Sequence, residues 1–351
     1  MDSLSQAVLG ASIVAAAVPA TQRRLGLLAG AILGTVPDLD TLIVPLFTQA
    51  PVSLFTWHRG PSHALWLLLL LALLLWWALK KISPAVRQAP RAWLIAMALA
   101  LITHPLLDAF TVYGTQLWWP TSSSPVMWAS LFIIDPLYTL PLLVVVLAVL
   151  LGGPKRWAFY TVVTGLVLST AYIGWSHISR SISSHAVAHS LQQQGLGGAP
   201  YLLMATPFNT LLWRVVVITE QGHAVGYRSI FDGDKTLQLS HYPSQPALLQ
   251  EQIAINPEVA RLAWFTSGFI NAEVRDRQLI INDLRMGTEG HFTFAFEVAQ
   301  NVAPDGAAPQ WQSHQVAPMV KRSGSMAAAM NKEWQATWGR IVQSWRERSA
   351  S

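Results

Sequence analysis

The first half of the chain alternates runs of hydrophobic residues with short polar stretches. Six runs are recognisable, at Leu4–Val18, Leu25–Val36, His63–Leu79, Trp93–Phe110, Leu131–Leu151 and Trp157–Trp175. A helix needs about 20 apolar residues to cross a hydrocarbon core of about 30 Å, so the last four runs are long enough or nearly so. The first two runs are shorter and rich in Ala and Gly. This predicts a helical hairpin or a re-entrant pair packed through small residues.

Beyond residue 175, shorter segments replace the long apolar runs. Strands are predicted at Trp213–Ile218, Gln278–Ile281 and His291–Glu297, and a helix at Met326–Arg348. The strand predictions rest on β-branched and aromatic residues and on alternation of apolar and polar positions. The sequence therefore predicts a polytopic α-helical membrane domain over residues 1–175, followed by a β-containing (α+β) soluble domain over residues 176–351.

Charge follows the same division. Charged residues make up 12% of the 351 residues, whereas a soluble domain has about 25%. Residues 1–175 contain 9 basic and 5 acidic residues, and residues 176–351 contain 14 basic and 13 acidic residues. This composition excludes a disordered chain, a coiled coil and a nucleic-acid-binding arm. The absence of Cys excludes disulfides, thiolate nucleophiles and Cys-ligated zinc.

The basic residues of the first half predict an orientation in the membrane. Eight of the nine lie in three loops, at Arg23 and Arg24, at Lys80, Lys81, Arg87 and Arg91, and at Lys155 and Arg156. If the runs alternate in direction, all three loops lie on one side, which the positive-inside rule makes cytoplasmic. We therefore expect a multi-pass membrane protein in contact with the lipid bilayer, with its C-terminal domain on the opposite side, which in a bacterium is the periplasm. No cleavable signal peptide is expected, because no basic residues precede the first apolar run.

Polar residues adjoin the apolar runs at a few positions. These are Asp38, Asp40, His58, His63, His104, Asp108 and Asp135. A carboxylate in such a place costs about 2.5 kcal/mol or more on insertion scales unless it has a partner. In the predicted topology every one of these residues lies toward the non-cytoplasmic face, although only Lys and Arg were used to orient the chain. The convergence predicts one polar site.

The spacing of these residues suits a metal ion. His104 and Asp108 are four residues apart and share one helical face. His58 and His63 flank a Gly-Pro turn, and Asp38 and Asp40 alternate after Pro37. A set of imidazoles and carboxylates without thiolates suits Zn²⁺, or else Mn²⁺. Six such groups exceed the needs of one zinc ion, so a two-metal site is a further possibility.

Each of these features also has a simpler interpretation. Asp38 and Asp40 are common turn or helix-capping residues, and His58 and His63 are compatible with a hydrated interface. His104 and Asp108 are compatible with a structural hydrogen-bonded pair, and Asp135 with an interfacial turn before Pro136. Arg59 suits either an anionic substrate or a lipid headgroup. The small number of other charges in this half favours a site.

Several short motifs follow one another in order along the chain. They are Met1-Asp2-Ser3-Leu4-Ser5-Gln6-Ala7-Val8-Leu9-Gly10, Pro37-Asp38-Leu39-Asp40, His58-Arg59-Gly60 with His63, Thr103-His104-Pro105-Leu106-Leu107-Asp108, Tyr113-Gly114-Thr115-Gln116 and Ile134-Asp135-Pro136-Leu137-Tyr138, then Pro207-Phe208-Asn209-Thr210-Leu211-Leu212-Trp213-Arg214 and Asp283-Leu284-Arg285-Met286-Gly287. This set resembles the bacterial inner-membrane family called YdjM-like, or membrane-bound metal-dependent hydrolases. One departure is Pro61-Ser62-His63-Ala64, where the family pattern has Phe-Thr-His-Ser.

The resemblance implies a metal-dependent hydrolase with ligands drawn from Asp38, Asp40, His58, His63, His104 and Asp108. We expect water activated by the metal to attack an ester-type bond, with a phosphoester or lipid as the substrate class. A weak likeness to zinc-dependent phospholipases C, in the His104-x-x-x-Asp108 spacing, favours the phosphoester. Asp40, Arg59 and Asp135 are the candidate catalytic residues, and the C-terminal domain is a candidate lid or substrate-recognition module.

Two rival functions remain open. One is a non-catalytic metal-binding membrane scaffold, and the other is a transporter whose His and Asp residues relay protons or cations. A transporter usually shows internal repeats and a site at the membrane midplane. The sequence shows no convincing repeat, and its polar cluster lies near one face. No nucleic-acid partner and no particular oligomeric state is predicted.

Overall fold

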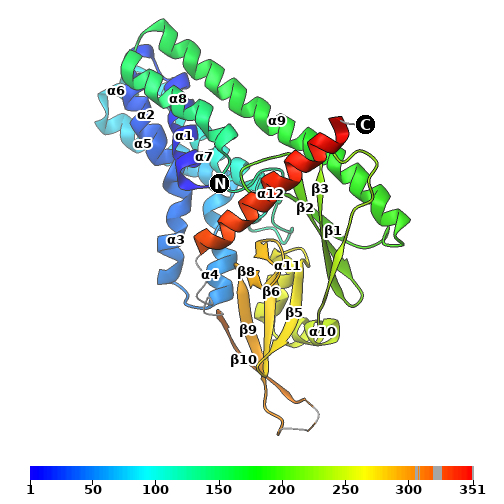
Figure 1. Cartoon of the computed structure of the whole chain (residues 1–351). Coiled ribbons are helices and arrows are strands. Elements are labelled where there is room, and N and C mark those ends of the chain that lie inside the picture. The colour runs from blue at the N-terminus through cyan, green and yellow to red at the C-terminus, as the bar shows by residue number, and fades with distance from the viewer. Residues whose placement is uncertain (305–306, 308, 319–325, 350–351) are drawn as a thin grey trace. The chain divides into compact units, whose positions relative to one another are not determined.

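The computed structural model describes residues 1–304, 307, 309–318 and 326–349. The chain divides into two units. The first comprises Met1–Phe47 with Trp57–His177, and the second comprises Thr48–Thr56 with Ile178–Ser351. Figure 1 shows the order of the elements, from the blue N-terminal helices to the red C-terminal helix. The first unit is helical and the second contains the sheets.

The helices of the first unit correspond to the six apolar runs. They are α1 (Ser3–Ala17), α2 (Arg23–Thr35), α5 (Leu65–Ile82), α7 (Pro90–Ala109), α8 (Pro136–Gly152) and the first part of α9 (Arg156–Gln193), joined by the shorter η1 (Ala20–Gln22), η2 (Val36–Leu39), α3 (Asp40–Ile43), η3 (Val44–Leu46), η4 (Pro61–His63) and α6 (Pro84–Gln88). Their core contains Val14, Trp93, Met97, Leu101 and Leu142, all almost completely buried.

Among the residues that the structure describes, four helical segments are long and apolar enough to cross a membrane. They are Ala20–Leu46, Leu65–Ile82, Pro90–Ala109 and Arg156–Gln193. On α5 the apolar side chains face outward, with Leu69, Leu73 and Leu74 each between 44% and 55% exposed. This is the surface expected of a helix that contacts lipid rather than water.

Two predictions about these runs were wrong. The second run is not short, because η2, α3 and η3 continue it beyond Pro37 into a 27-residue candidate span. The fifth run is shorter than predicted: α8 begins at Pro136 and has 17 residues. Asp135 caps this helix and Pro136 occupies its first turn, so Leu131 and its neighbours stay outside it.

The hairpin of α1 and α2 is packed through small residues, as predicted. Gly26, Gly30 and Gly34 recur every fourth residue on α2. A side-chain carbon added at Gly30 would overlap the carbonyl oxygen of Gly10 on α1, and one added at Gly34 would overlap the carbonyl oxygen of Gln6. The two backbones therefore approach as closely as glycine allows.

Replacing Gly30 with alanine is expected to destabilise the first unit by about 1–3 kcal/mol, because the new methyl group meets backbone that cannot move aside. The midpoint of thermal unfolding in detergent should fall. Gly174→Ala in α9 is the matched control, since no described atom lies within 4 Å of the added carbon. That variant should be neutral or more stable by up to about 1 kcal/mol. Equal effects of the two variants would contradict the tight packing of the hairpin.

The second unit contains two antiparallel four-stranded sheets. One has the order β1 (Tyr201–Ala205), β2 (Leu212–Thr219), β3 (Gly222–Ser229) and β4 (Ser240–Pro243), and the other β10 (Trp311–Pro318), β9 (Ala295–Asn301), β6 (Gln278–Asp283) and β5 (Ile270–Arg275). The pair β7 (Gly287–Thr288) and β8 (His291–Phe292) and the helices α10 (Pro246–Ile255), α11 (Pro257–Phe265) and α12 (Met326–Ser349) complete the unit. The helix predicted near the C-terminus is confirmed by α12.

Two of the three predicted strands are confirmed, within β2 and β6. The third, His291–Glu297, is two strands: β8 ends at Phe292 and β9 begins at Ala295. The chain changes partners at this point, because the Thr293 amide donates to the Met286 carbonyl and the Phe294 carbonyl accepts from the Asp283 amide. Alternation of side chains alone does not reveal such a change.

A short helix from the first half of the chain belongs to the second unit. This is α4 (Pro51–Trp57), of which residues 51–56 are part of that unit. The ring of Phe55 packs against those of Phe265, Phe294 and Phe296, with centroid distances of 5.0, 4.4 and 5.8 Å. Phe55 is 5% exposed. The sequence had no signal for this docking, because the segment lies between two candidate membrane spans.

Candidate metal centre

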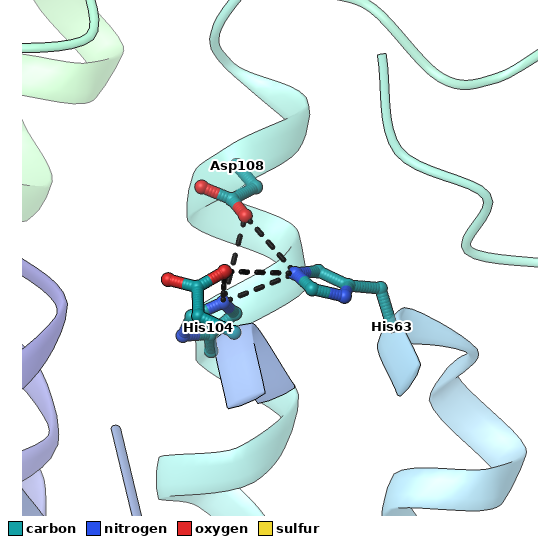
Figure 2. A group of neighbouring side chains, drawn as sticks. His63, His104 and Asp108 are labelled. Carbon is teal, nitrogen blue, oxygen red and sulfur yellow. Dashed lines mark hydrogen bonds and ion pairs between the residues drawn. The ribbon is translucent and has the colours of Figure 1, made fainter. Parts of the chain in front are cut away.

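Four of the predicted ligands meet inside the first unit. Asp38 comes from η2, His63 from η4, and His104 and Asp108 from successive turns of α7. Figure 2 shows His104 and Asp108 on one face of α7, with the ring of His63 pointing toward both. His63, His104 and Asp108 are at most 1% exposed. The four side chains form a buried group that could hold a metal ion.

The distances between the donor atoms are those of a tetrahedral site. His63 Nε2 lies 3.1 Å from His104 Nε2, 3.2 Å from Asp108 Oδ2 and 3.6 Å from Asp38 Oδ1. His104 Nε2 lies 3.4 Å from Asp38 Oδ1 and 3.5 Å from Asp108 Oδ2. Four ligands at about 2.0–2.1 Å from a tetrahedral zinc ion are about 3.3 Å apart. Five of the six distances among the four donor atoms are therefore close to this value.

Helix α7 keeps its two ligands aligned despite Pro105 between them. The helix runs without a break from Pro90 to Ala109. Proline removes one backbone donor and leaves a carbonyl one turn earlier without its usual partner. The i,i+4 spacing of His104 and Asp108 nevertheless places both side chains on one face. The sequence prediction that this pair shares a face is confirmed by their 3.5 Å separation.

The two carboxylate oxygens of Asp108 have different surroundings. Its Oδ1 accepts hydrogen bonds from the amino group of Met1 and from Gln6 Nε2, the latter at 3.0 Å. Its Oδ2 is buried, forms no hydrogen bond of good geometry among the residues that the structure describes, and lies 3.1 Å from Arg59 Nε. This oxygen also faces the two imidazoles, and burying a carboxylate is costly unless its charge is compensated. A metal ion held between the imidazoles and Asp108 would add to the compensation that Arg59 provides.

Both imidazoles are oriented by a hydrogen bond on the far side of the ring. His104 Nδ1 lies 2.6 Å from the Gly34 carbonyl, which can only accept, so Nδ1 carries the proton. His63 Nδ1 lies 2.9 Å from Ser62 Oγ, which itself donates to Asp40 Oδ2 at 2.5 Å. In both rings Nε2 is thereby directed at the site. Metal-binding histidines are usually held in this way.

Position 62, where the resemblance leads us to expect Thr, carries Ser and so keeps a hydroxyl group. This hydroxyl links His63 to Asp40. We expect Ser62→Ala to weaken metal affinity by about 10-fold or more, since the imidazole loses its orientation. Ser62→Thr, which keeps the hydroxyl group, should retain the native metal affinity. Competition for zinc with a chromogenic chelator measures both, and an unchanged affinity in the alanine variant would count against this role.

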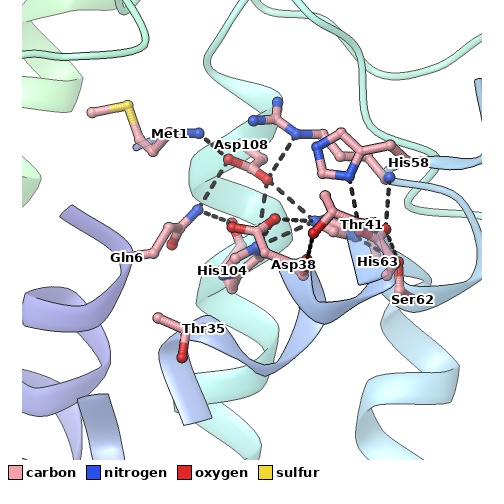
Figure 3. A network of polar contacts seen from close by, with 12 residues as sticks. Met1, Gln6, Thr35, Asp38, Thr41, His58, Ser62, His63, His104 and Asp108 are labelled. Carbon is pink, nitrogen blue, oxygen red and sulfur yellow. Dashed lines mark hydrogen bonds and ion pairs between the residues drawn. The ribbon is translucent and has the colours of Figure 1, made fainter. Parts of the chain in front are cut away.

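Asp38 also belongs to a second group, with Asp40 and His58, whose donor atoms lie within 4.8 Å of one another. His58 Nδ1 is 2.8 Å from Asp40 Oδ1, and Asp40 Oδ2 accepts from the Arg59 amide at 3.0 Å. The side chains of Asp38 and His58 are 22% and 23% exposed. Figure 3 shows this group continuous with the buried one. The site is therefore accessible on the side of Asp38 and His58.

Arg59 lies inside the unit rather than at its surface. It is 3% exposed, and its backbone has a positive φ of 60°. Its Nε lies 3.1 Å from Asp108 Oδ2, its Nη1 donates to Thr111 Oγ1 at 3.0 Å, and its guanidinium lies 5.0 Å from the ring centre of Tyr113. This position argues against a lipid headgroup as its partner. Arg59 compensates the charge of Asp108.

Asp135 is not brought into either group. Its Oδ1 accepts from the amides of Leu137 and Tyr138 at the start of α8, and its Oδ2 accepts from the Tyr172 hydroxyl at 2.9 Å. Both oxygens are thus used to cap one helix and join it to α9. The geometry supports the simpler interpretation of this residue, a structural one.

Sequence reasoning missed the residues that support the ligands. Gln6, Ser62, Gly34 and Thr111 all contact a candidate site residue. The signal for Gln6 was weak but present, because a buried amide within an apolar helix needs a polar partner. The carbonyl of Gly34 had no such signal, since any residue offers a carbonyl.

Comparison with known proteins identifies the first unit. The family model described as YdjM inner membrane protein matches residues 1–183, which is more than half of the chain. The two resembling segments of the second half, residues 207–214 and 283–287, lie outside this match. No curated protein and no solved structure matches the chain. With its apolar helices and its ordered motifs, the chain belongs to the YdjM inner membrane protein family.

Proposed function

We propose that the protein is a multi-pass membrane protein of the bacterial inner membrane, with its C-terminal unit in the periplasm. Four candidate spans, outward-facing leucines on α5 and membership of an inner-membrane family support the insertion. The proposed orientation counts the shorter apolar helices α1 and α8 among the crossings and rests on the basic loops, since alternation of direction then puts Lys80, Lys81 and Lys155 on one side, taken as cytoplasmic.

We further propose that the protein is a metal-dependent hydrolase. The observation that supports this best is the meeting of four potential donor atoms, in which Asp108 Oδ2 lies 3.2 Å from His63 Nε2 and 3.5 Å from His104 Nε2. Hydrogen bonds on the far side of both rings prepare those nitrogens to bind an ion. A merely structural ion pair would not need two imidazoles whose Nε2 atoms are oriented toward the same point.

Asp38, His63, His104 and Asp108 would hold the ion, and their nitrogen and oxygen donors suit Zn²⁺ or Mn²⁺. When bound, such an ion supplies Lewis acidity, polarising an ester or phosphoryl oxygen and lowering the pKa of water toward neutrality. Arg59 holds positive charge beside Asp108 and limits the repulsion between the site and an anionic substrate.

His58 and Asp40 are the proposed proton-transfer pair. Asp40 Oδ1 accepts from His58 Nδ1, which leaves His58 Nε2 available to take a proton from water or return one to a leaving group. His58 is on the accessible side of the site, where a substrate would arrive. The alternative use of the same residues is a second ion, held by Asp38, Asp40 and His58. We retain an ester-type substrate, phosphoester or lipid, as the proposed class.

The test is metal content and turnover of the full-length protein in detergent. Zinc and manganese are quantified by atomic spectroscopy, and hydrolysis is followed on a phosphodiester, a phosphomonoester, a carboxyl ester and a phospholipid. Bound metal with turnover, lost on chelation and restored by Zn²⁺ or Mn²⁺, supports the hydrolase. Bound metal without turnover on any of these supports the scaffold instead. Metal-dependent cation flux in proteoliposomes without hydrolysis supports the transporter.

A further inference from the structure

The C-terminal helix α12 presents two different faces. Figure 1 shows it as the red helix that ends at the C-terminus. Within residues 335–349, Thr337, Ile341 and Ser344 are between 0% and 5% exposed. They recur at positions four and three apart, as one face of a helix requires. This face packs on the first sheet of the second unit, where α12 contacts β3.

Polar contacts fix which side of α12 faces the sheet. Ser344 Oγ donates to Ser229 Oγ at 2.9 Å, and Arg340 Nη2 lies 2.9 Å from Asp232 Oδ1. Arg348 Nη1 donates to the Ile230 carbonyl at 3.2 Å. The helix therefore cannot turn about its axis without breaking these bonds, and its outer face is defined.

One flank of the exposed side of α12 is apolar, next to a polar part that includes Gln343 and Arg346. Trp338, Val342 and Trp345 are 36%, 40% and 55% exposed, at positions i, i+4 and i+7. Two tryptophans and a valine in one stripe are unusual on a surface that meets only water. Tryptophan is the residue most typical of membrane interfaces, where its ring is apolar and its N–H remains hydrated.

The charges around the stripe suit an anionic surface. Arg346 and Arg348 lie in the last turn of α12. Glu347, the acid between them, is already paired with Lys235. The net charge beside the apolar stripe is therefore positive, which favours lipid phosphates. Among the described residues α12 is not a candidate span, so the helix would lie on a bilayer rather than cross it.

We propose that α12 binds the surface of the bilayer through Trp338, Val342 and Trp345, with Arg346 among the phosphates. The inference rests on the proposed membrane insertion of the first unit. That insertion would also tether α12 near the bilayer, because α9 runs from a candidate span directly into the second unit. A tethered helix needs little intrinsic affinity to stay on the membrane.

The absence of cysteine allows a direct test with single-cysteine variants. Val342→Cys on the stripe, Gln343→Cys beside it and Leu73→Cys on α5 are each labelled with a fluorophore. All three native side chains are exposed, so labelling does not disturb the core. The full-length protein is placed in nanodiscs of phosphatidylcholine and phosphatidylglycerol that contain lipids with a quencher on the acyl chain.

We expect strong quenching at position 73, and quenching at 342 that exceeds that at 343 by about twofold or more. Trp345→Ser with Arg346→Gln, added to the Val342→Cys variant, should remove the excess. Quenching at 73 with equal values at 342 and 343 would overturn the inference and leave membrane insertion intact. A blue-shifted label at 342 without lipid quenching would indicate a protein partner and would overturn it as well. Absence of quenching at 73 would refute the insertion on which it rests.

Discussion

His104→Ala is expected to abolish metal binding and, with it, the proposed hydrolysis. The imidazole Nε2 of His104 lies 3.1–3.5 Å from donor atoms of His63, Asp38 and Asp108, so it is within 3.5 Å of each of the other three candidate ligands. Loss of a residue that merely orients a ligand weakens metal sites by about 10–100-fold, and we expect loss of the ligand itself to exceed about 100-fold. Metal content per protein after dialysis measures this effect, and turnover should fall in parallel.

Two variants serve as controls for His104→Ala. His185→Ala removes an exposed imidazole of α9 that bonds only to the Ser181 carbonyl, and Asp135→Asn removes a carboxylate outside both groups of candidate ligands. Both should keep full metal content. His104→Ala with normal metal content would show that the buried group does not hold the ion. Loss of the metal with full turnover would show that the reaction does not need this metal.

The convergence of the polar residues could be predicted because charge is so scarce in the first half of the chain. Only 5 acidic residues occur among residues 1–175, and burying one without a partner is costly. Each polar side chain of this half was therefore expected to contact another polar group or solvent, and this applies to Asp38, His63, His104 and Asp108. The i,i+4 spacing of His104 and Asp108 added geometry, since a helix fixes the direction of both side chains.

The support of the ligands could not be predicted, because it depends on how helices pair. The Gly34 carbonyl reaches His104 only because α2 lies against α7, and no residue type signals a carbonyl. The buried position of Arg59 depends on a positive φ that arginine rarely adopts. Periodicity describes one helix at a time, so contacts between elements lie beyond it.

The errors at the boundaries of elements have a similar origin. Hydropathy placed Leu131 in a helix that begins only at Pro136, where Asp135 supplies the cap. Alternation joined β8 and β9, which the structure separates at Thr293 and Phe294. Phe294 turns toward Phe55, 4.4 Å away between ring centres and more than 200 residues distant in sequence. Tertiary contacts of this kind override local pattern.

In the second unit, Arg285→Ala is expected to lower the free energy of unfolding by about 3–5 kcal/mol. Arg285 forms two parallel hydrogen bonds with Asp283, from Nε to Oδ1 at 2.9 Å and from Nη2 to Oδ2 at 2.7 Å. The two side chains are 0% and 1% exposed. Removing the guanidinium leaves the Asp283 carboxylate buried without a cation. The resulting desolvation penalty is larger than the net stabilisation that the intact ion pair provides.

Arg275 and Glu273 on β5 form a comparison pair with the same sequence spacing, in which Nε and Nη2 both donate to Glu273 Oε1, at 3.1 and 2.6 Å. Their side chains are 30% and 36% exposed, so water can solvate Glu273 when its partner is lost. Arg275→Ala should therefore cost about 1 kcal/mol or less. Hydrogen exchange of the β6 amides in the full-length protein reports the free energy of opening of this unit for both variants. Because Glu273 stays accessible to water whereas Asp283 does not, equal losses would show that desolvation of Asp283 is not what makes its arginine necessary.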